Sequence, residues 1–159
     1  MADREEALRE YYWVQAAIES TDTKSFQIKS WSVTVATGAA GAAFLEGEPS
    51  LLLLAGGASC VFWLTDALWK SFQMIWRSRG EALERMLAQG DLDSYAGPAI
   101  HAHFAKSFRS VWSWFRVGRC LFKANVYLPH VVTATLSFLL YWLQVVGWPG
   151  VFDLFPMQM

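Results

Sequence analysis

The sequence predicts an all-α integral membrane protein with three transmembrane helices, its N-terminus in the cytoplasm and its C-terminus outside. Three observations support this class. Of the 159 residues, 54% are hydrophobic and 16% aromatic, and the nine Trp are typical of membrane interfaces. Three apolar stretches alternate with polar segments. All 13 Lys and Arg fall in 1–29 or 70–123. A chain of this length is expected to form a single membrane domain.

Residues 1–29 are expected to form a cytoplasmic helix that leads into the membrane. Charged residues fill its first turns, and Tyr11, Val14 and Ile18 give it an apolar side at helical spacing. The run 20–23 (Ser-Thr-Asp-Thr) leaves two possibilities open, because such residues compete for backbone hydrogen bonds. Either the helix breaks there, or a second helix starts near Thr23 with a cap.

The first predicted span, 30–46, is short and rich in small residues. Only 16 residues separate Lys29 from Glu46, whereas a hydrocarbon core of about 30 Å requires about 20. Gly38 and Gly41 would let another helix approach closely. We therefore expect this span to pack tightly against a neighbour.

The second span, 51–69, follows a turn at 46–50 that contains Gly and Pro. With the first span it forms a membrane hairpin, and its helix continues into the cytoplasm as far as residue 89. Gly56 and Gly57 form another small patch, which we expect to face the glycines of the first span.

A basic amphipathic helix is predicted over 99–123, and the third span over 126–148. The helix can lie on an anionic membrane surface, or it can pack its apolar stripe on the extension of the second span. The third span contains 23 residues, enough to cross a membrane. The residues expected to contact an anionic ligand or lipid surface are Lys106, Arg109, Arg116, Arg119 and Lys123.

The distribution of basic residues sets the orientation. No Lys or Arg lies in the 46–50 turn or after residue 123. Under the positive-inside rule, both basic regions are then cytoplasmic. We expect an integral protein of a bacterial inner membrane, with lipid as one partner. The net charge of −1 argues against a nucleic-acid partner.

Asp66 is the main candidate for a functional residue, because a carboxylate inside a span is costly. It can form an ion pair with Lys70, four residues later on the same helix. Alternatively, it faces a water-filled pathway or another subunit. His130 lies near the same end of the third span, so a contact between Asp66 and His130 is also possible.

Hydroxyl side chains in the spans are weaker candidates for a polar pathway. Ser and Thr in spans usually bond to their own helix or a neighbour. The hydroxyl residues that can line such a path are Thr34, Thr37, Ser32, Thr65, Ser59, Thr133, Thr135 and Ser137. Cys60 is expected to be a buried thiol without a special role. No metal-ligand spacing, cofactor motif or catalytic constellation is present in the sequence, so we expect a protein that is not an enzyme.

The architecture over residues 10–90 resembles the SLATT-type proteins, small bacterial effectors associated with nucleotide-signalled defence. The resemblance lies in the lead-in helix, the tight hairpin 31–69 and the helix after Lys70. It implies a homo-oligomeric membrane pore with polar faces of the hairpin lining it. A cytoplasmic protein or an anionic small molecule would be a further partner. The third span at 126–148 departs from the simplest two-span pattern.

Two functions therefore follow from the sequence. The first is a homo-oligomeric membrane channel or pore-forming effector, because three short helices enclose no pathway alone. The second is a structural or accessory subunit of a larger membrane complex, in which the many aromatic side chains contact a partner.

Overall fold

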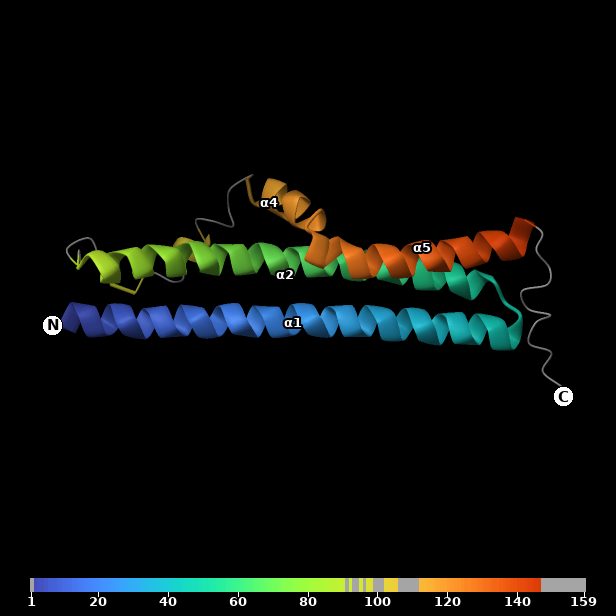
Figure 1. The fold of residues 1–159 in the computed structure, drawn as a ribbon, viewed down its shortest axis with the longest axis horizontal. Helices are drawn as coiled ribbons and strands as arrows, with labels where there is room; N and C mark the ends of the chain where they lie inside the picture. Colours follow the sequence, from blue (N-terminus) through green and yellow to red (C-terminus); the bar gives the residue numbers. More distant parts are fainter. Residues whose placement is uncertain are drawn as a thin grey trace. The chain divides into compact units, whose positions relative to one another are not determined.

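The computed structural model describes residues 2–90, 92, 95, 97–98, 102–105 and 112–146, and this part of the chain contains helices and no strand. The helices are α1 (Ala2–Glu46), α2 (Ser50–Gln89), α4 (Trp112–Leu121) and α5 (Ala124–Val146), shown in Figure 1. Residues 102–105 form a further helical turn. The predicted all-helical class is confirmed.

Helix α1 runs through 45 residues without a break, so both possibilities for the run 20–23 are wrong. The hydroxyls of Thr21 and Thr23 donate to carbonyls of their own helix four residues earlier, at 2.7 and 3.1 Å. They are thus satisfied inside the helix and neither end it nor cap a new one. No Gly or Pro interrupts the sequence before Gly38.

The turn between α1 and α2 is defined by Gly47, whose φ of 68° is a left-handed conformation. The N–H of Glu48 donates to the carbonyl of Ala43 at 3.2 Å, which is the longer bond of a Schellman motif. Pro49 follows and begins the first turn of α2, where Leu52 N–H donates to its carbonyl at 3.0 Å. This local chemistry reverses the chain.

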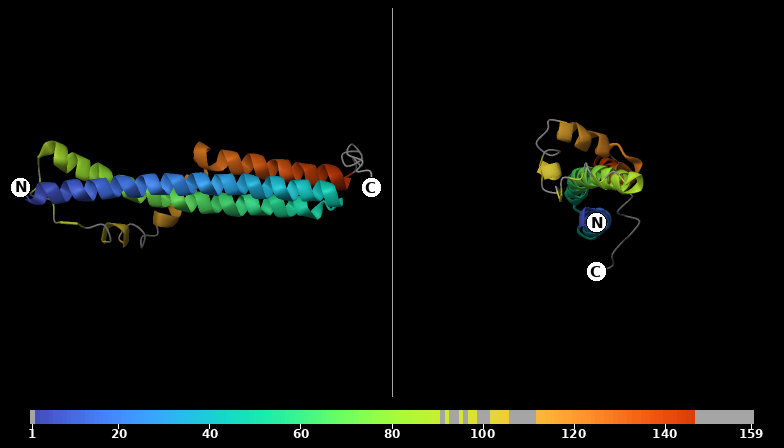
Figure 2. Two further views of the ribbon diagram at one scale, coloured as in Figure 1. Left: turned by 90° about the horizontal axis from the view of Figure 1, so that it is seen from below. Right: turned by 90° about the vertical axis from the view of Figure 1, so that its left-hand side faces the viewer.

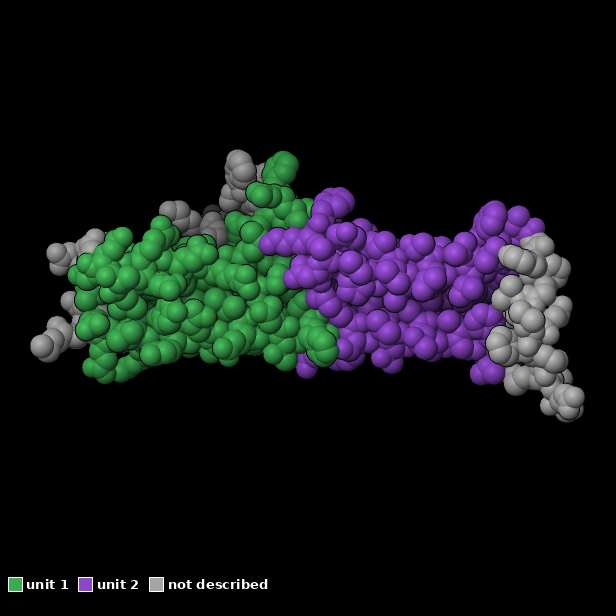
Figure 3. All heavy atoms as spheres, in the orientation of Figure 1, with its two compact units in different colours: residues 1–26, 67–120 green, residues 27–66, 121–159 purple. Residues whose placement is uncertain are grey.

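The chain packs as two compact units, which are coloured separately in Figure 3. Unit 1 comprises Met1–Phe26 and Ala67–Cys120, and unit 2 comprises Gln27–Asp66 and Leu121–Met159. Helices α1 and α2 contribute to both. Within each unit these two helices lie side by side and run in opposite directions (Figures 1 and 2).

The core of unit 1 forms where α1 meets the second half of α2. Val14 and Leu83 are fully buried there. A Cβ added to Gly80 would lie 3.5 Å from the Val14 side chain, an ordinary van der Waals contact, so α2 packs directly on the Val14 side chain here. From α4, the Cys120 sulfur lies 3.5 Å from the sulfur of Met74 on α2.

In unit 2, α5 packs against the hairpin of α1 and α2. A Cβ at Gly56 would lie 2.7 Å from the ring of Phe138, so α2 approaches α5 closely at this glycine. A Cβ at Gly38, Gly41 or Gly57 would meet nothing within 4 Å. The expectation that the glycines of the two hairpin arms face each other is therefore wrong, because α1 and α2 bury other faces against one another.

Two helices, α2 and α5, are long and apolar enough to cross a membrane. Helix α1 does not meet this measure; its apolar part is short and rich in small residues. Residues 147–148 of the predicted third span lie outside the described residues, as does much of the helix expected over 99–123. Cys60 is exposed rather than buried, because it lies on the outward face of α2.

Candidate functional site

Four polar side chains meet inside unit 2, where α1, α2 and α5 come together. Lys29 and Ser32 come from α1, Asp66 from α2 and His130 from α5. The last three residues are at most 1% exposed, and the Lys29 side chain is 22% exposed. Lys29 and Ser32 share a face of α1 because they are three residues apart. We call these four residues the buried polar cluster.

The Asp66 carboxylate is the centre of the buried polar cluster. Its Oδ2 lies 2.8 Å from the Lys29 Nζ. A fully buried carboxylate is stable only when an opposite charge or hydrogen-bond donors compensate for its lost hydration. The partly exposed Lys29 supplies that charge while its ammonium keeps some contact with its surroundings.

His130 connects this ion pair to Ser32. Its Nε2 lies 3.6 Å from the same carboxylate oxygen of Asp66, and its Nδ1 lies 3.0 Å from the Ser32 Oγ. The 3.0 Å contact is a hydrogen bond between the ring and Ser32, whereas the 3.6 Å contact with the carboxylate is longer than a hydrogen bond. The chain of polar contacts thus runs from Lys29 through Asp66 and His130 to Ser32.

The order Ser32, His130, Asp66 is also that of a serine-hydrolase triad, in which the histidine takes a proton from the serine. Ser32 is only 1% exposed, and Asp66 is already neutralised by Lys29. A substrate carbonyl therefore has no approach to the hydroxyl in this packing. The arrangement is suited to holding three helices together.

The predicted pair of Asp66 with Lys70 is wrong. The Lys70 Nζ instead lies 3.3 Å from the Oδ1 of Asp22 on α1, in unit 1. In an antiparallel hairpin, residues equally far from the turn lie side by side, and this places Lys29 beside Asp66. The spacing of four residues allowed the expected pair, but a buried carboxylate faces the neighbouring helices.

Of the hydroxyls suggested for a polar pathway, Ser32 joins the cluster, whereas Thr34, Thr37 and Ser59 do not. Thr34 and Ser59 donate to carbonyls of their own helices, four residues earlier, at 2.9 and 3.0 Å. Thr34 and Thr37 are exposed, whereas Ser59 is buried. Among the pathway candidates of the sequence, the structure brings together Asp66, His130 and Ser32.

Sequence reasoning missed Lys29, and it named Ser32 only as one of several hydroxyls that can line a polar path. A signal for Lys29 was present, because it lies about as far before the turn as Asp66 lies after it. No signal distinguished Ser32 from the other hydroxyls, since a serine in a span usually bonds to its own helix. Its actual partner, His130, belongs to a helix that is distant in the sequence.

The predicted basic surface is described only in part. Lys106 and Arg109 lie outside the described residues. Arg119 is exposed on α4, and Arg116 and Lys123 are half-buried. These three cations lie on α4 or directly after it.

Charge pairs also join α1 to α2 in unit 1. Arg79 donates two hydrogen bonds to the carboxylate of Glu10, both of 2.9 Å, and the Glu10 side chain is 1% exposed. At Asp22, burial raises the pKa, but a hydrogen bond from Gln73 and the nearby positive charges, chiefly Lys70, outweigh it. The pKa of Asp22 therefore lies below its ordinary value.

Aromatic rings attach the helical turn 102–105 to the hairpin in unit 1. Phe104 stacks on Trp76 at 5.1 Å between ring centroids and contacts Phe72 at 5.8 Å. On its other side, Trp76 meets the edge of Trp13 from α1 at 5.5 Å. The rings thus connect three segments of unit 1.

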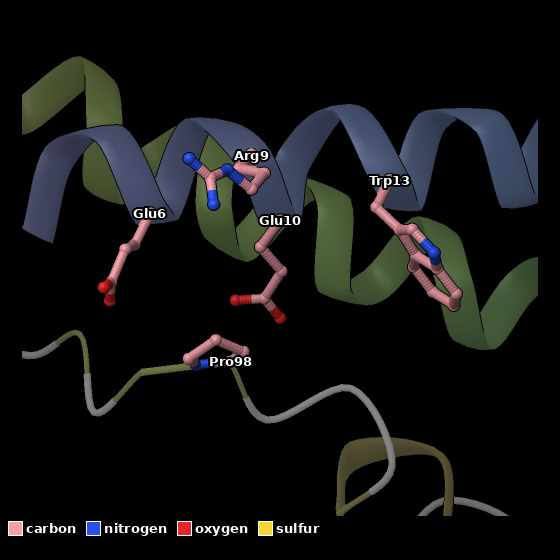
Figure 4. A pocket seen from close by; sticks show the side chains of 5 residues that line it. All are labelled: Glu6, Arg9, Glu10, Trp13 and Pro98. Atoms are coloured by element: carbon pink, nitrogen blue, oxygen red, sulfur yellow. The ribbon is translucent and has the colours of Figure 1, made fainter.

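A pocket of about 340 Å³ lies beside the first turns of α1 in unit 1, lined by Glu6, Arg9, Glu10, Trp13 and Pro98. In Figure 4 the carboxylates of Glu6 and Glu10 point toward the segment that carries Pro98. The Glu10 carboxylate is already bonded to a guanidinium of α2. The pocket is lined by acidic and basic side chains and one indole, and this mixture indicates no particular class of ligand.

Within the described ranges, no three His, Cys, Asp or Glu side chains come together as they would to hold a metal ion. No protein-family model, curated protein or solved structure matches this chain. The residues themselves are therefore the guide to its function.

Proposed function

We propose that this chain spans a membrane three times, over 30–46, 51–69 and 126–148, and that several copies assemble into an ion channel. Large apolar side chains on the outer surface of unit 2 support the three spans. They come from all three helices and are 41–66% exposed: Trp31, Val33, Val35, Leu53, Leu54, Val61, Leu64, Leu128, Val132, Leu136 and Trp142. Water-soluble monomers rarely expose apolar surface on this scale, and lipid is its natural solvent.

The orientation follows from charge. The segments 30–69 and 124–159 contain no Lys or Arg. Both basic segments then lie in the cytoplasm, and the turn at 46–50 and the C-terminus lie outside. We assign the protein to a bacterial inner membrane.

The outward face of α1 is the single observation that carries the channel proposal. Ser30, Thr34, Thr37, Gly38 and Gly41 are all exposed and recur at spacings of three and four residues. The exposed apolar side chains Trp31, Val33 and Val35 flank this face on α1, whereas the outward faces of α2 and α5 carry mainly large apolar side chains. Small and hydroxyl-bearing faces favour helix contacts in lipid. A ring of copies with these faces turned toward its axis would enclose a polar path.

In this proposal the buried polar cluster fixes the rotation of α1. The pairing of Lys29 with Asp66 and of Ser32 with His130 holds one face of α1 inward, so the hydroxyl and glycine face points outward. Asp66 and His130 then lie behind the pathway and act as positioning residues.

The resemblance of residues 10–90 to SLATT-type proteins extends the proposal to a biological role. A pore-forming effector of bacterial defence would open when a signal reaches its cytoplasmic helices. An anionic small molecule or a cytoplasmic protein are the partners that this role implies.

A matched pair of substitutions tests the channel. Gly41→Leu and Gly57→Leu add the same side chain to the membrane part of α1 and α2, and both glycines face open space in one copy. We expect the wild type and Gly57→Leu to form the same closed oligomer in detergent and to conduct ions in liposomes. Gly41→Leu should lose the oligomer and most of the flux.

Equal behaviour of the two variants would remove α1 from the contact between copies. A wild-type protein that stays monomeric in mild detergent and in lipid nanodiscs would contradict the channel. A strictly mixed complex of fixed composition, isolated from native membranes, would favour the accessory-subunit function instead.

A further inference from the structure

Helix α4 has two opposite faces. Val117 and Cys120 are 8% and 0% exposed, and they pack against the rest of unit 1. Phe115 lies on the other side and is 68% exposed, and Trp114, at the edge between the two faces, is 72% exposed. Phe122, in the turn directly after α4, is 78% exposed. Three large aromatic side chains thus face outward within nine residues of sequence.

Positive charge accompanies this aromatic face. Residues 94–152 contain five Lys and Arg and no Asp or Glu. Arg116 and Arg119 follow the aromatic pair on α4, and Lys123 follows Phe122. With about 100° between successive residues of a helix, Arg119 lies beside the ring of Phe115, at the edge of the exposed face. Aromatic rings flanked by cations are typical of helices that lie in a membrane interface.

The last residue of α4, Leu121, belongs to unit 2. The indole N–H of Trp63, in the apolar part of α2, donates to the carbonyl of Leu121 at 3.0 Å. Residues 122 and 123 separate α4 from α5. Leu121 is therefore held within unit 2, three residues before α5 begins at Ala124.

We infer that α4 lies in the headgroup layer of the cytoplasmic leaflet and binds anionic phospholipids. Trp114, Phe115 and Phe122 enter the boundary between headgroups and acyl chains, and Arg116 and Arg119 contact lipid phosphates. An anionic leaflet is complementary to both parts of the surface, because it offers negative charge beside an apolar layer. The inference rests on the proposed membrane spans and does not depend on conduction.

Photocrosslinking in nanodiscs tests the inference. The photoreactive amino acid p-benzoylphenylalanine replaces Phe115 in the full chain, in equimolar phosphatidylglycerol and phosphatidylcholine, and mass spectrometry identifies the adducts. The same residue at Leu64, on the outward face of α2, reports contact with bulk lipid. At Tyr12, which is 68% exposed on α1 in unit 1, it reports a position outside the membrane.

We expect lipid adducts at 115 and 64 and none at 12. At 115 the ratio of phosphatidylglycerol to phosphatidylcholine adducts should exceed the ratio at 64, by about fivefold for each cation that contacts the headgroup. Arg116→Gln with Arg119→Gln should bring the ratio at 115 close to that at 64, with the far-UV circular dichroism unchanged.

Three results would overturn the inference. The first is an absence of lipid adducts at 115 when they are abundant at 64, and the second is equal lipid ratios at the two positions. The third is a dominant protein adduct at 115, which would mean that a partner or a second copy covers α4. An absence of lipid adducts at 64 would instead contradict the proposed spans themselves.

Discussion

Removal of the negative charge at Asp66 leaves the Lys29 ammonium without its carboxylate inside unit 2. The two groups lie 2.8 Å apart, which corresponds to about 6 kcal/mol of attraction at an effective dielectric constant of about 20. Lys29 is 22% exposed and can recover part of its hydration. We therefore expect Asp66→Asn to lower the free energy of unfolding by about 3–5 kcal/mol, as for other broken buried pairs.

A double-mutant cycle separates this pair from general damage. Lys29→Met, Asp66→Asn and their combination are unfolded in mixed micelles of increasing SDS content at pH 7, with helicity followed by circular dichroism. We expect a coupling energy of about 3 kcal/mol, because the combination leaves neither charge unpaired. The pair of Lys70 with Asp22 provides the matched control, since the Asp22 side chain is 52% exposed.

For the control cycle, Lys70→Met with Asp22→Asn, we expect a coupling below about 1 kcal/mol, the range of exposed ion pairs. The reasoning is refuted if the coupling between Lys29 and Asp66 is no larger than this control. Such a result would mean that water reaches the carboxylate of Asp66 and screens the pair.

Three further predictions use the same unfolding measurement. Gly56→Ala should lower the free energy of unfolding by about 1–3 kcal/mol, because its methyl group would lie 2.7 Å from a phenyl carbon. Gly57→Ala, which adds the methyl group in open space, should raise it by up to about 1 kcal/mol, and a loss at both positions would contradict the packing. Glu10→Gln should lower it by about 1.5–3 kcal/mol, because it weakens two buried bonds to a guanidinium. Glu5→Gln, in a pair that is 79% exposed on both sides, should change it by less than about 0.5 kcal/mol, and equal effects of the two substitutions would disprove the difference in burial. The lowered pKa of Asp22 means that its contribution is fully present above the ordinary value of 3.8 and is lost as the pH falls through the folded-state value. Asp22→Asn should remove this loss, which is below about 1 kcal/mol for a half-exposed group, and identical acid titrations of the two proteins would contradict it.

The hairpin was predictable because its determinants are local. Gly47 adopts a left-handed backbone conformation and Pro49 follows two positions later. A few neighbouring residues therefore determine the turn. The helices on either side follow from long stretches without breakers. At the run 20–23 the local rules failed, because a threonine hydroxyl can cap a new helix or bond back within the old one.

The partners inside unit 2 depend on how each helix is rotated about its own axis. Composition predicted a close approach at Gly56, but it could not identify the ring of Phe138 as the neighbour, because that ring comes from a distant helix. The contact of His130 with Ser32 has the same origin. Such pairings depend on how the faces of α1, α2 and α5 pack together. No single segment therefore carries a sequence pattern that predicts them.

The order of charges along the hairpin determines its register. On α1, Glu10 and Asp22 are acidic and pair with basic residues of α2, whereas Lys29 is basic and pairs with an acidic one. The charge that α1 contributes to these pairs therefore changes sign once along the helix. If α2 slid by one helical turn, Lys29 would lie opposite Lys70, and Asp66 would lose its cation. Apolar contacts that repeat every three or four residues tolerate such a slip far better. The single reversal of sign thus makes one alignment of two long helices much more favourable than its nearest competitor.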